Sequence, residues 1–450
     1  MKRAWITVAW TLVLCMTTGG CLTREPFPPN VLVILADDLG WNQLGCYGGP
    51  YHTPAIDSLA SRGTRFTNAY ASAAVCSPTR AALMTGKYPA RLHITDFIRG
   101  QSFPDSLLEQ PEWQKYLPLE ELTLAEIFKN QGYHTALFGK WHLSLEKKPP
   151  ESEPFNPGKQ GFDECMITYK PVSGITNPEH DPHNADSITG RSVRFLKERG
   201  KGPFFLVVSH NAIHDPLMES QANIDAYRDQ YPEPPFPVKP EVGAMVARLD
   251  RSVSALLAAL EELNLSERTI VVFCSDNGGK EAHASQYPLR KGKGWLHEGG
   301  IRVPLIVRWP GRIEEGARDH RVNATIDLFP TILELAGIGV PDSLDGISMA
   351  GELLGTGSSG NRALFWHYPH YHGGSGMKPA SALRSGKYKL IEWHEEYLLG
   401  KHAWELYNLE NDQGELTDLS TSHPALLDSL KRQLHGWRAG VGAQMPSLKE

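Results

Sequence analysis

Acidic side chains follow two separate apolar runs of this 450-residue chain, at the points where the runs end. Asp37 and Asp38 come directly after residues 31–36, and Asp276 and Asn277 follow the run in TIVVFCSDNGG. Open α/β sheets bind ligands beyond the carboxyl ends of their strands, so these side chains are expected to share one site. Three carboxylates and an amide oxygen suit Ca²⁺ or Mg²⁺. The sequence therefore predicts a divalent metal site.

Cationic and imidazole side chains stand at or near the ends of other apolar runs. They are Arg80, Lys140, His142, His214 and Lys293. Together they would bind the oxygens of a tetrahedral anion and supply a general acid to its leaving oxygen. Singly, each has a structural alternative: a surface lysine, a buried histidine with satisfied hydrogen bonds, or an arginine paired with a carboxylate.

A cysteine stands where a helix is expected to begin. In AYASAAVCSPTRAALMTG, Pro78 suits a first helical turn, because its missing N–H costs nothing there, and Gly86 suits a C-terminal stop. Cys76 then lies at or just before a helix N-terminus, a position that favours anions and a deprotonated or modified thiol. A small buried cysteine near a helix start is the plain structural alternative.

Short apolar runs alternate with amphipathic segments along most of the chain. Strands are expected at residues 31–36, 66–69, 135–138 and 204–208, and within TIVVFCSDNGG and RVPLIVRWPG. Helices are expected in TPAIDSLASRGTRF, MVARLDRSVSALLAALEELN and ATIDLFPTILELAGI, and at the start of TLAEIFKNQGYHTALFGKWHL. This alternation predicts an α/β fold whose large domain has a mostly parallel central sheet flanked by helices.

The composition turns to glycine and serine around LDGISMAGELLGTGSSGN, which indicates a boundary. Beyond it, ALFWHYPHY, ASALRSGKYKLIEW and AWELYNLENDQGE predict antiparallel strands, and HPALLDSLKRQLHGWRAG predicts a closing helix. We therefore expect a catalytic domain over residues 28–350 and a smaller C-terminal α+β subdomain with an antiparallel sheet over residues 351–450.

Residues 1–21 have the pattern of a signal peptide: Lys2 and Arg3, an apolar run to Met16, then small residues. TTGGC also resembles a bacterial lipoprotein processing site, although Thr18 stands where a leucine-like residue is usual. Either the leader is cleaved without a lipid, or Cys21 becomes a lipidated first residue that anchors the protein to a membrane. We expect an exported bacterial protein, either periplasmic or an outer-membrane lipoprotein.

The formal net charge is −6, from 45 basic and 51 acidic side chains, and the sequence has no basic run. A nucleic-acid partner is therefore not expected. Four cysteines lie beyond the leader, at Cys46, Cys76, Cys165 and Cys274. They are too scattered for a disulfide scaffold or a CxxC metal site.

Two segments carry a family resemblance. CSPTR, residues 76–80, resembles the Cys-x-Pro-x-Arg motif of the type I sulfatases in the alkaline phosphatase superfamily, and GYHTALFGKWH, residues 132–142, resembles that family's second motif. The resemblance extends from LADDLG through SDNGG to YKLIEW and ELYNLENDQGE. Within the family, the sequence is similar to bacterial glycan sulfatases and to the arylsulfatase A and N-acetylgalactosamine sulfatase group. It implies the fold described above and a sulfuric ester hydrolase.

The resemblance also implies a mechanism. A maturase would oxidise Cys76 to formylglycine before the chain folds, and the hydrated aldehyde would be the nucleophile. The metal, usually Ca²⁺ with Mg²⁺ as the alternative, would be held by Asp37, Asp38, Asp276, Asn277 and the modified Cys76. Arg80 and the metal would favour loss of a proton from the hydroxyl that attacks sulfur.

The remaining roles follow from the same resemblance. Lys140, His142 and Lys293 would bind the sulfate oxygens or steady the diol. His214, which lies in HDPL, matches the family's histidine-then-proline element and would protonate the leaving alcohol. His210 lies closer to its strand and is expected to be structural.

The implied reaction is hydrolysis of sulfate esters on sulfated carbohydrates, with galactose or N-acetylgalactosamine units, and release of inorganic sulfate. Phosphorus esters have a similar tetrahedral anionic centre, so a phosphonate monoester or phosphodiester hydrolase of the same superfamily is the alternative. A catalytically inactive binding protein is a third hypothesis. It would be expected to lack Cys76, Arg80 or a metal carboxylate, and all of them are present.

Substrate selection is expected in loops and in the C-terminal subdomain. ARLHITDFIRG and FWHYPHYHGG resemble segments of sulfatases that act on sulfated galactose or N-acetylgalactosamine. His367, His370 and His372 are expected near the rim of the pocket, and His180 lies in a polar loop that is expected to touch substrate. The alternative is that FWHYPHY is only a strand packed between the subdomains.

Overall fold

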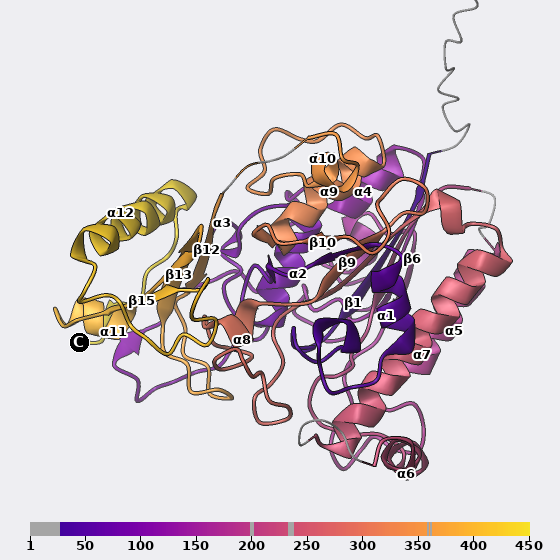
Figure 1. Ribbon diagram of the computed structural model, residues 1–450, viewed down its shortest axis with the longest axis horizontal. Helices are drawn as coiled ribbons and strands as arrows, with labels where there is room; N and C mark the ends of the chain where they lie inside the picture. Colours follow the sequence, from indigo (N-terminus) through magenta and orange to yellow (C-terminus); the bar gives the residue numbers. More distant parts are fainter. Residues whose placement is uncertain (1–27, 199–201, 233–237, 358–359, 361) are drawn as a thin grey trace, which may run out of the picture.

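The computed structural model describes residues 28–198, 202–232, 238–357, 360 and 362–450. The predicted leader and Cys21 lie outside the described residues. Within the described part of the chain, no helix is long and apolar enough to cross a membrane. A large α/β unit lies beside a smaller C-terminal unit (Figure 1).

The central sheet has eight strands in the order β10-β2-β9-β8-β1-β7-β5-β6. In chain order they are β1 Asn30–Ala36, β2 Thr64–Phe66, β5 His134–Gly139, β6 Glu164–Ile167, β7 Phe204–Ser209, β8 Thr269–Ser275, β9 Leu305–Arg308 and β10 Arg318–Asp319. Neighbouring strands are parallel except where β9 pairs with β2 and β8. The predicted mostly parallel sheet is therefore confirmed.

Strand β9 runs against its neighbours because of the connection that precedes it. The segment 276–304 leaves β8 at the carboxyl edge of the sheet, and Gly278 N–H and Gly300 O join its two ends (2.9 Å). The chain therefore re-enters the sheet from the edge at which it left. This connection also carries Lys293 past the end of β8.

The strand expected at residues 66–69 is divided in two, so that prediction was wrong in its extent. Strand β2 ends at Phe66, and β3, Ala69–Tyr70, leaves the large sheet to pair with β11, Asn323–Ala324. Between them Arg302 Nη2 donates to Thr67 O (2.6 Å) and Asn68 Oδ1 (2.9 Å). These contacts turn the chain out of the sheet and toward the segment that leads to Cys76.

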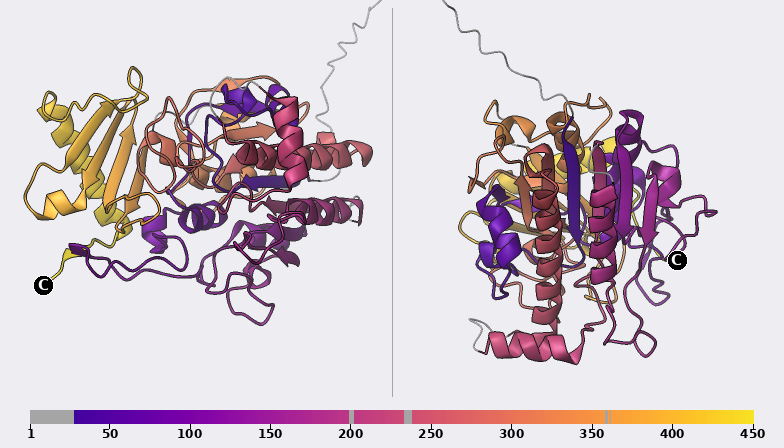
Figure 2. Two further views of the ribbon diagram at one scale, coloured as in Figure 1. Left: turned by 90° about the horizontal axis from the view of Figure 1, so that it is seen from below. Right: turned by 90° about the vertical axis from the view of Figure 1, so that its right-hand side faces the viewer.

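Helices cover both faces of the central sheet (Figures 1 and 2). Alternate residues of β1 face opposite sides: Val31 and Val33 pack with α2, α4, α9 and α10, whereas Leu32 and Ile34 pack with α1, α5, α6 and α7. The helices of the first face are α2 Cys76–Thr85, α4 Leu124–Asn130, α9 Leu328–Leu335 and α10 Ala350–Leu353. Those of the second are α1 Pro54–Ser61, α5 Ala185–Glu198, α6 Gln221–Gln230 and α7 Pro240–Glu262.

The C-terminal unit is an antiparallel four-stranded sheet with one long helix, which confirms the predicted fold of the subdomain. Its strands are β12 Ala363–Tyr368, β13 Ala380–Ser385, β14 Tyr388–Trp393 and β15 Trp404–Asn408, and its helix is α12 Pro424–Val441. One face of the sheet packs on α12. The other packs on the large unit, where Trp366 donates to Ala71 O (2.8 Å) and joins an apolar cluster with Val75 and Ala82.

Several further elements are short. They are α3 Pro89–Leu92, α8 Glu298–Ile301, α11 His394–Leu398 and the pair formed by β4 Leu108–Glu109 and β16 Ser447–Leu448. Helix α10 continues past residue 350, and Leu353 packs in the core of the large unit. The segment after α10 is therefore the link between the two units.

Candidate active site

Four adjacent strands, β8, β1, β7 and β5, end at one edge of the central sheet. Each is followed by a candidate residue: Asp276 after β8, Asp37 after β1, His210 after β7 and Lys140 after β5. Two residues just beyond these ends, Asp38 (φ 63°) and His142 (φ 61°), have left-handed backbones, which non-glycine residues rarely adopt and which gather at functional sites. The parallel sheet therefore brings the separated motifs to one place.

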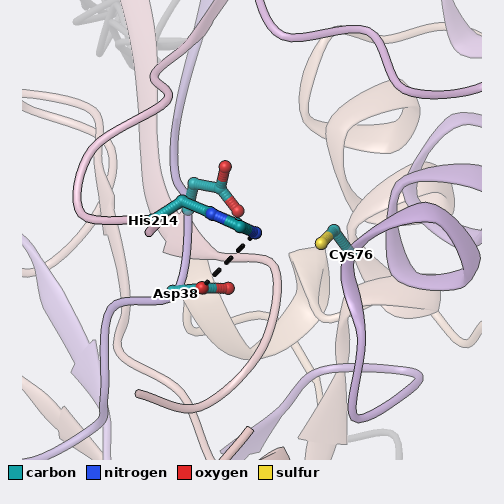
Figure 3. Close-up of side chains that lie close together, drawn as sticks. Asp38, Cys76 and His214 are labelled. Atoms are coloured by element: carbon teal, nitrogen blue, oxygen red, sulfur yellow. Dashed lines mark ion pairs between the residues drawn. The ribbon is translucent and has the colours of Figure 1, made fainter. Parts of the chain in front are cut away.

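Cys76 faces this edge from the start of helix α2. Val75 has an extended backbone before it, and Gly86 (φ 67°) ends the helix, as the sequence predicts. The thiol is 1% exposed, and its Sγ lies 3.7 Å from Lys293 Nζ. Figure 3 shows Cys76 across a gap from Asp38 and His214. The helix N-terminus thus presents the cysteine side chain to the strand-end groups.

Three buried carboxylates are each paired with a buried cation. Lys140 Nζ lies 2.8 Å from Asp37 Oδ2, Lys293 Nζ lies 2.7 Å from Asp38 Oδ1, and Arg80 Nη2 lies 2.7 Å from Asp276 Oδ2. The side chains that carry these charges are at most 10% exposed. Buried charges are tolerated when each has a partner, so these pairs keep the site charged and folded.

The pairing sets the protonation states. Burial alone would raise the pKa of Asp38, but nearby positive charges, Lys293 foremost, hold it well below its usual range. Burial would also raise the pKa of the Cys76 thiol, yet Lys140 and Lys293 lower it. Burial and then the charge of Lys140 lower the pKa of His142 to about 3, so its ring is neutral at ordinary pH.

The predicted metal ligands lie together. Asp38 N–H donates to Asp276 Oδ1 (3.2 Å), and Asn277 Nδ2 donates to Asp38 Oδ1 (2.8 Å). One ligand atom each from Asp37, Asp38, Cys76 and His214 lies within 4.8 Å of the others. Asp37 Oδ1 and Asn277 Oδ1 are buried and receive no hydrogen bond from any described residue. Such unpartnered buried oxygens fit the ligand set of a hard divalent cation.

The two histidines after β7 have different surroundings. His214 Nδ1 donates to Asp215 O (2.8 Å), so its Nε2, 3.8 Å from Asp38 Oδ2, is the atom that faces the site (Figure 3). His210 is fully buried, and its Nε2 is bonded to Ser252 Oγ of α7 (3.1 Å). This contact gives His210 a place in the packing of the helix layer.

Two further side chains that the sequence assigns to the site, those of Arg80 and His142, are held by backbone carbonyls. Arg80 Nη1 donates to Lys140 O (2.9 Å), and His142 Nε2 donates to Ile98 O (2.6 Å). His142 Nδ1 is buried and has no hydrogen-bond partner among the described residues. An imidazole nitrogen left free in this way is available to a ligand.

The substrate candidates do not gather at one place. His372 lines a cavity of about 340 Å³ together with Lys293 and Trp295, and Ser375 Oγ, 2.8 Å from its Nδ1, fixes the ring. His180 is exposed on the loop after Asn177, and no hydrogen bond or ion pair joins its side chain to a described site residue.

Neither His367 nor His370 lies at a rim as predicted: His367 is buried within the subdomain, and His370 is buried between the subdomain and the large unit. His367 contacts Ser381 Oγ and Gln444 O, both at 2.8 Å. His370 Nε2 accepts from Thr95 Oγ1 (2.8 Å), and its Nδ1 donates to Gln110 Oε1 (3.1 Å). Both ring nitrogens of each are thus occupied by protein groups.

Sequence reasoning missed two supporting residues. Ser209, the last residue of β7, accepts from Arg80 Nη1 (2.6 Å) and donates to Lys140 O (2.7 Å). His183 Nε2 donates to His214 O (2.9 Å) and so fixes the loop that carries His214. Ser209 could have been assigned to the site from its position at the end of a predicted strand. No feature of the sequence indicates that His183 supports His214.

Buried oxygens that could hold a hard cation, flanking cations and a cysteine at a helix N-terminus are the groups that hydrolysis of an ester with a tetrahedral anionic centre requires. Comparison with known families narrows this class. The family model Sulfatase matches residues 29–338, and the model N-sulphoglucosamine sulphohydrolase, C-terminal, matches residues 291–439. The chain belongs to the sulfatase family of the alkaline phosphatase superfamily and is a sulfuric ester hydrolase.

Individual relatives agree with this assignment. The chain is 32% identical to arylsulfatase A of Homo sapiens, covering 94% of this chain and 89% of the relative. It is 30% identical to N-acetylgalactosamine-6-sulfatase of Canis lupus familiaris (94% and 88% covered) and to a sulfatase of Formosa agariphila (91% and 88%).

Solved structures share the fold. The structure of Ps i-CgsB in complex with k-i-k-neocarrahexaose has a TM-score of 0.74 at 28% identity, covering 91% of this chain and 92% of that one. The phosphonate monoester hydrolase of Agrobacterium radiobacter has a TM-score of 0.69 at 21% identity, covering 94% and 100%. The second likeness concerns the fold alone.

Burial of His370 is expected to make the protein less stable in acid. Burial lowers the pKa of His370 to about 3, so below about pH 6.5 the unfolded chain binds a proton that the folded chain does not. The free energy of unfolding therefore falls as pH drops from about 6.5 toward 3, by up to about 1.4 kcal/mol per pH unit for this group.

In His370→Gln, denaturant titrations from pH 8 to pH 4 are expected to give a slope of unfolding free energy against pH that is smaller by about this amount. Gln110→Ala is the matched control, because it removes the same hydrogen bond and keeps the titrating ring. An equal change of slope in both variants would contradict the assignment.

Proposed function

We propose that this sulfatase removes sulfate from sulfated carbohydrates built of galactose or N-acetylgalactosamine, using a formylglycine made from Cys76. The observation that carries the proposal is the position of Cys76, buried at the start of α2, 3.7 Å from Lys293 and opposite the carboxylates. The named relatives support the substrate class: two act on N-acetylgalactosamine-6-sulfate or aryl sulfates by name, and Ps i-CgsB was solved with a neocarrahexaose.

The chemistry explains why a cysteine alone would not serve. A hydrated aldehyde at residue 76 offers one hydroxyl to attack sulfur and a second through which sulfate is expelled. Cys76 Sγ marks where that group would stand in the structure. Lys293 lies beside it and would stabilise negative charge there. Arg80, which Asp276 and Ser209 hold in place, lies at the same edge of the central sheet.

The metal would be held by Asp37, Asp38, Asp276 and Asn277 with the modified residue 76. Ca²⁺ is the cation we propose, with Mg²⁺ as the alternative, because every protein ligand is an oxygen. Such a cation supplies positive charge to the developing oxyanion. Nearby positive charges, Lys293 foremost, hold the pKa of Asp38 well below its usual range against the effect of burial, so this carboxylate need lose no proton to bind the cation.

Sulfate oxygens and the leaving alcohol would meet different groups. Lys140 and Lys293 carry positive charge to the sulfate oxygens. The free Nδ1 of the neutral His142 is a hydrogen-bond acceptor, because Nε2 carries the proton, and it would accept from a hydroxyl of the diol. The Nδ1 proton of His214 stays hydrogen-bonded to Asp215 O, so the ring would act as a general acid in its imidazolium form, in which Nε2 carries a second proton and delivers it to the leaving alcohol.

The sugar would lie against the cavity beside Lys293. His372 and Trp295 line it, and an aromatic wall beside hydrogen-bonding groups is a common environment for sugar rings. We propose His372 as a substrate contact, while His367 and His370 support the same segment from within.

The nucleophile is tested by replacing it. Cys76→Ala is expected to lower sulfate release from nitrophenyl sulfate and from sulfated galactose by roughly 10³-fold or more, because the nucleophile is removed. Cys165→Ala, at an exposed cysteine of β6, is the control and is expected to retain activity. The peptide that contains residue 76, from protein made with a formylglycine-generating maturase, should have the mass of the aldehyde.

Undiminished release by Cys76→Ala would refute the mechanism. Faster turnover of a phosphodiester than of any sulfate ester would favour the phosphonate or phosphodiester alternative.

The metal site is tested by stability as well as by activity. Adding Ca²⁺ to chelator-treated protein is expected to raise the free energy of unfolding, by about 2.7 kcal/mol when free Ca²⁺ is 100 times its Kd. Asn277→Ala is expected to shift this response to higher Ca²⁺ concentration. Asn130→Ala, at an exposed helix end, is the matched control. An identical Ca²⁺ response in Asn277→Ala and wild type would place the ion elsewhere.

We also propose export, with Cys21 as the site of a lipid anchor in the periplasm or outer membrane. Support comes from the sequence pattern of residues 1–21 alone. When the full chain is expressed in a bacterium, Cys21→Ser is expected to move the protein from the membrane fraction to the soluble fraction and to abolish fatty-acid labelling. Equal fractionation of the two chains would indicate cleavage without a lipid.

A further inference from the structure

One lysine beside the site has no role in the chemistry described above. Lys170 follows β6, the strand next to β5, and its side chain is only partly buried. The backbone that leads to it is tied to the site: Thr168 N–H donates to Gly139 O (2.9 Å), directly before Lys140, and Asn211 Nδ2 donates to Thr168 Oγ1 (2.7 Å). Lys170 is thus anchored at the same edge of the sheet as the other site residues.

Its neighbour Tyr169 forms part of the wall of the site. The Tyr169 ring lies edge-on to the His142 ring, with 6.4 Å between centroids, and Asn184 Nδ2 donates to Tyr169 O (2.9 Å). Contacts on both sides of the backbone therefore fix the direction in which the next residue leaves the wall. Lys170 extends from a rigid segment rather than from a free loop.

Lys170 differs from the other cations of the site in its charge balance. Lys140, Lys293 and Arg80 each have a carboxylate partner. No hydrogen bond or ion pair joins the Lys170 ammonium to any other described side chain. Burial, and then the positive charge of Lys293, lowers the pKa of Lys170.

We propose that Lys170 binds a second anionic group of the substrate, a carboxylate or a sulfate other than the one that is cleaved. The inference rests on the proposed function of the site. The cleaved sulfate would meet the deeply buried Lys140 and Lys293, whereas Lys170 is less buried and directly follows Tyr169, whose ring lies against His142. A partly desolvated ammonium without a counterion is unfavourable, so a substrate anion supplies the missing partner.

The geometry therefore makes Lys170 a specificity-determining residue for glycans that carry more than one negative charge. A neutral sugar with a single sulfate would leave Lys170 without its partner and would bind less tightly. A uronate next to the sulfated unit, or a second sulfate on it, would satisfy the ammonium.

The experiment compares Lys170→Met with wild type on four substrates: nitrophenyl sulfate, monosulfated galactose, disulfated galactose, and sulfated N-acetylgalactosamine linked to a uronate. Lys147→Met is the matched control, since Lys147 is exposed and its Nζ lies over the Tyr169 ring, 4.9 Å from the centroid. In Lys170→Met, kcat/KM is expected to fall about tenfold more on a doubly charged substrate than on nitrophenyl sulfate, chiefly through KM.

The two doubly charged substrates distinguish the sources of the anion: a selective loss on the disulfated sugar identifies a sulfate, and a selective loss on the uronate identifies a carboxylate. Equal losses on all four substrates, or the same losses in Lys147→Met, would overturn the inference.

Binding gives a second readout. The ligands are disulfated galactose and the uronate disaccharide, and the proteins compared are Cys76→Ala and the double variant Cys76→Ala with Lys170→Met. For at least one ligand, the Kd is expected to be about tenfold higher in the double variant. An unchanged Kd for both would also overturn the inference. If wild type releases sulfate from no sugar but hydrolyses nitrophenyl sulfate, the proposed carbohydrate function fails, and this binding comparison still decides the role of Lys170.

Discussion

The site depends on the balance of charge among three buried ion pairs. Asp37, Asp38 and Asp276 stand where four parallel strands end, and unpaired carboxylates at such depth would be strongly unfavourable. The partner cations come from separate parts of the chain: Arg80 from α2, Lys140 from the end of β5 and Lys293 from the long connection after β8. The same pairs therefore join these segments to the sheet, place Cys76 beside them and gather carboxylate oxygens that could hold a metal. The three buried ion pairs thus contribute both to the fold and to the position of the site groups.

Much of this arrangement was predictable from sequence because it depends on local pattern plus one rule of topology. Buried strands followed by acidic residues located Asp38 and Asp276, and the rule that parallel strands end at one edge brought them together. Pro78 and Gly86 located helix α2 to within its capping residues, and the structure agrees. The antiparallel C-terminal sheet was equally predictable, since its four strands follow one another in the chain and each pairs with the next.

The rest depends on contacts between distant segments. His370 and His372 lie two residues apart, yet one is buried against Thr95 and Gln110 while the other lines a cavity, and no local pattern separates them. Lys170 stands alone in a loop, so only its neighbours in space distinguish it from a surface lysine. The direction of β9 depends on the edge at which the preceding connection returns, which strand propensity does not encode.

The packing of the C-terminal sheet determines when, during synthesis of the chain, the segment before Cys76 becomes covered. Trp366 of β12 closes over the segment that leads into α2, bonding Ala71 O and packing near Val75. Residue 76 is made early by the ribosome, whereas the strands that cover this segment are made late. A nascent chain that ends before β12 thus lacks the surface that encloses the segment before Cys76. An enzyme that must reach the thiol can therefore act while the chain between residue 76 and β12 is being synthesised. Access ends when the C-terminal sheet packs on the large unit.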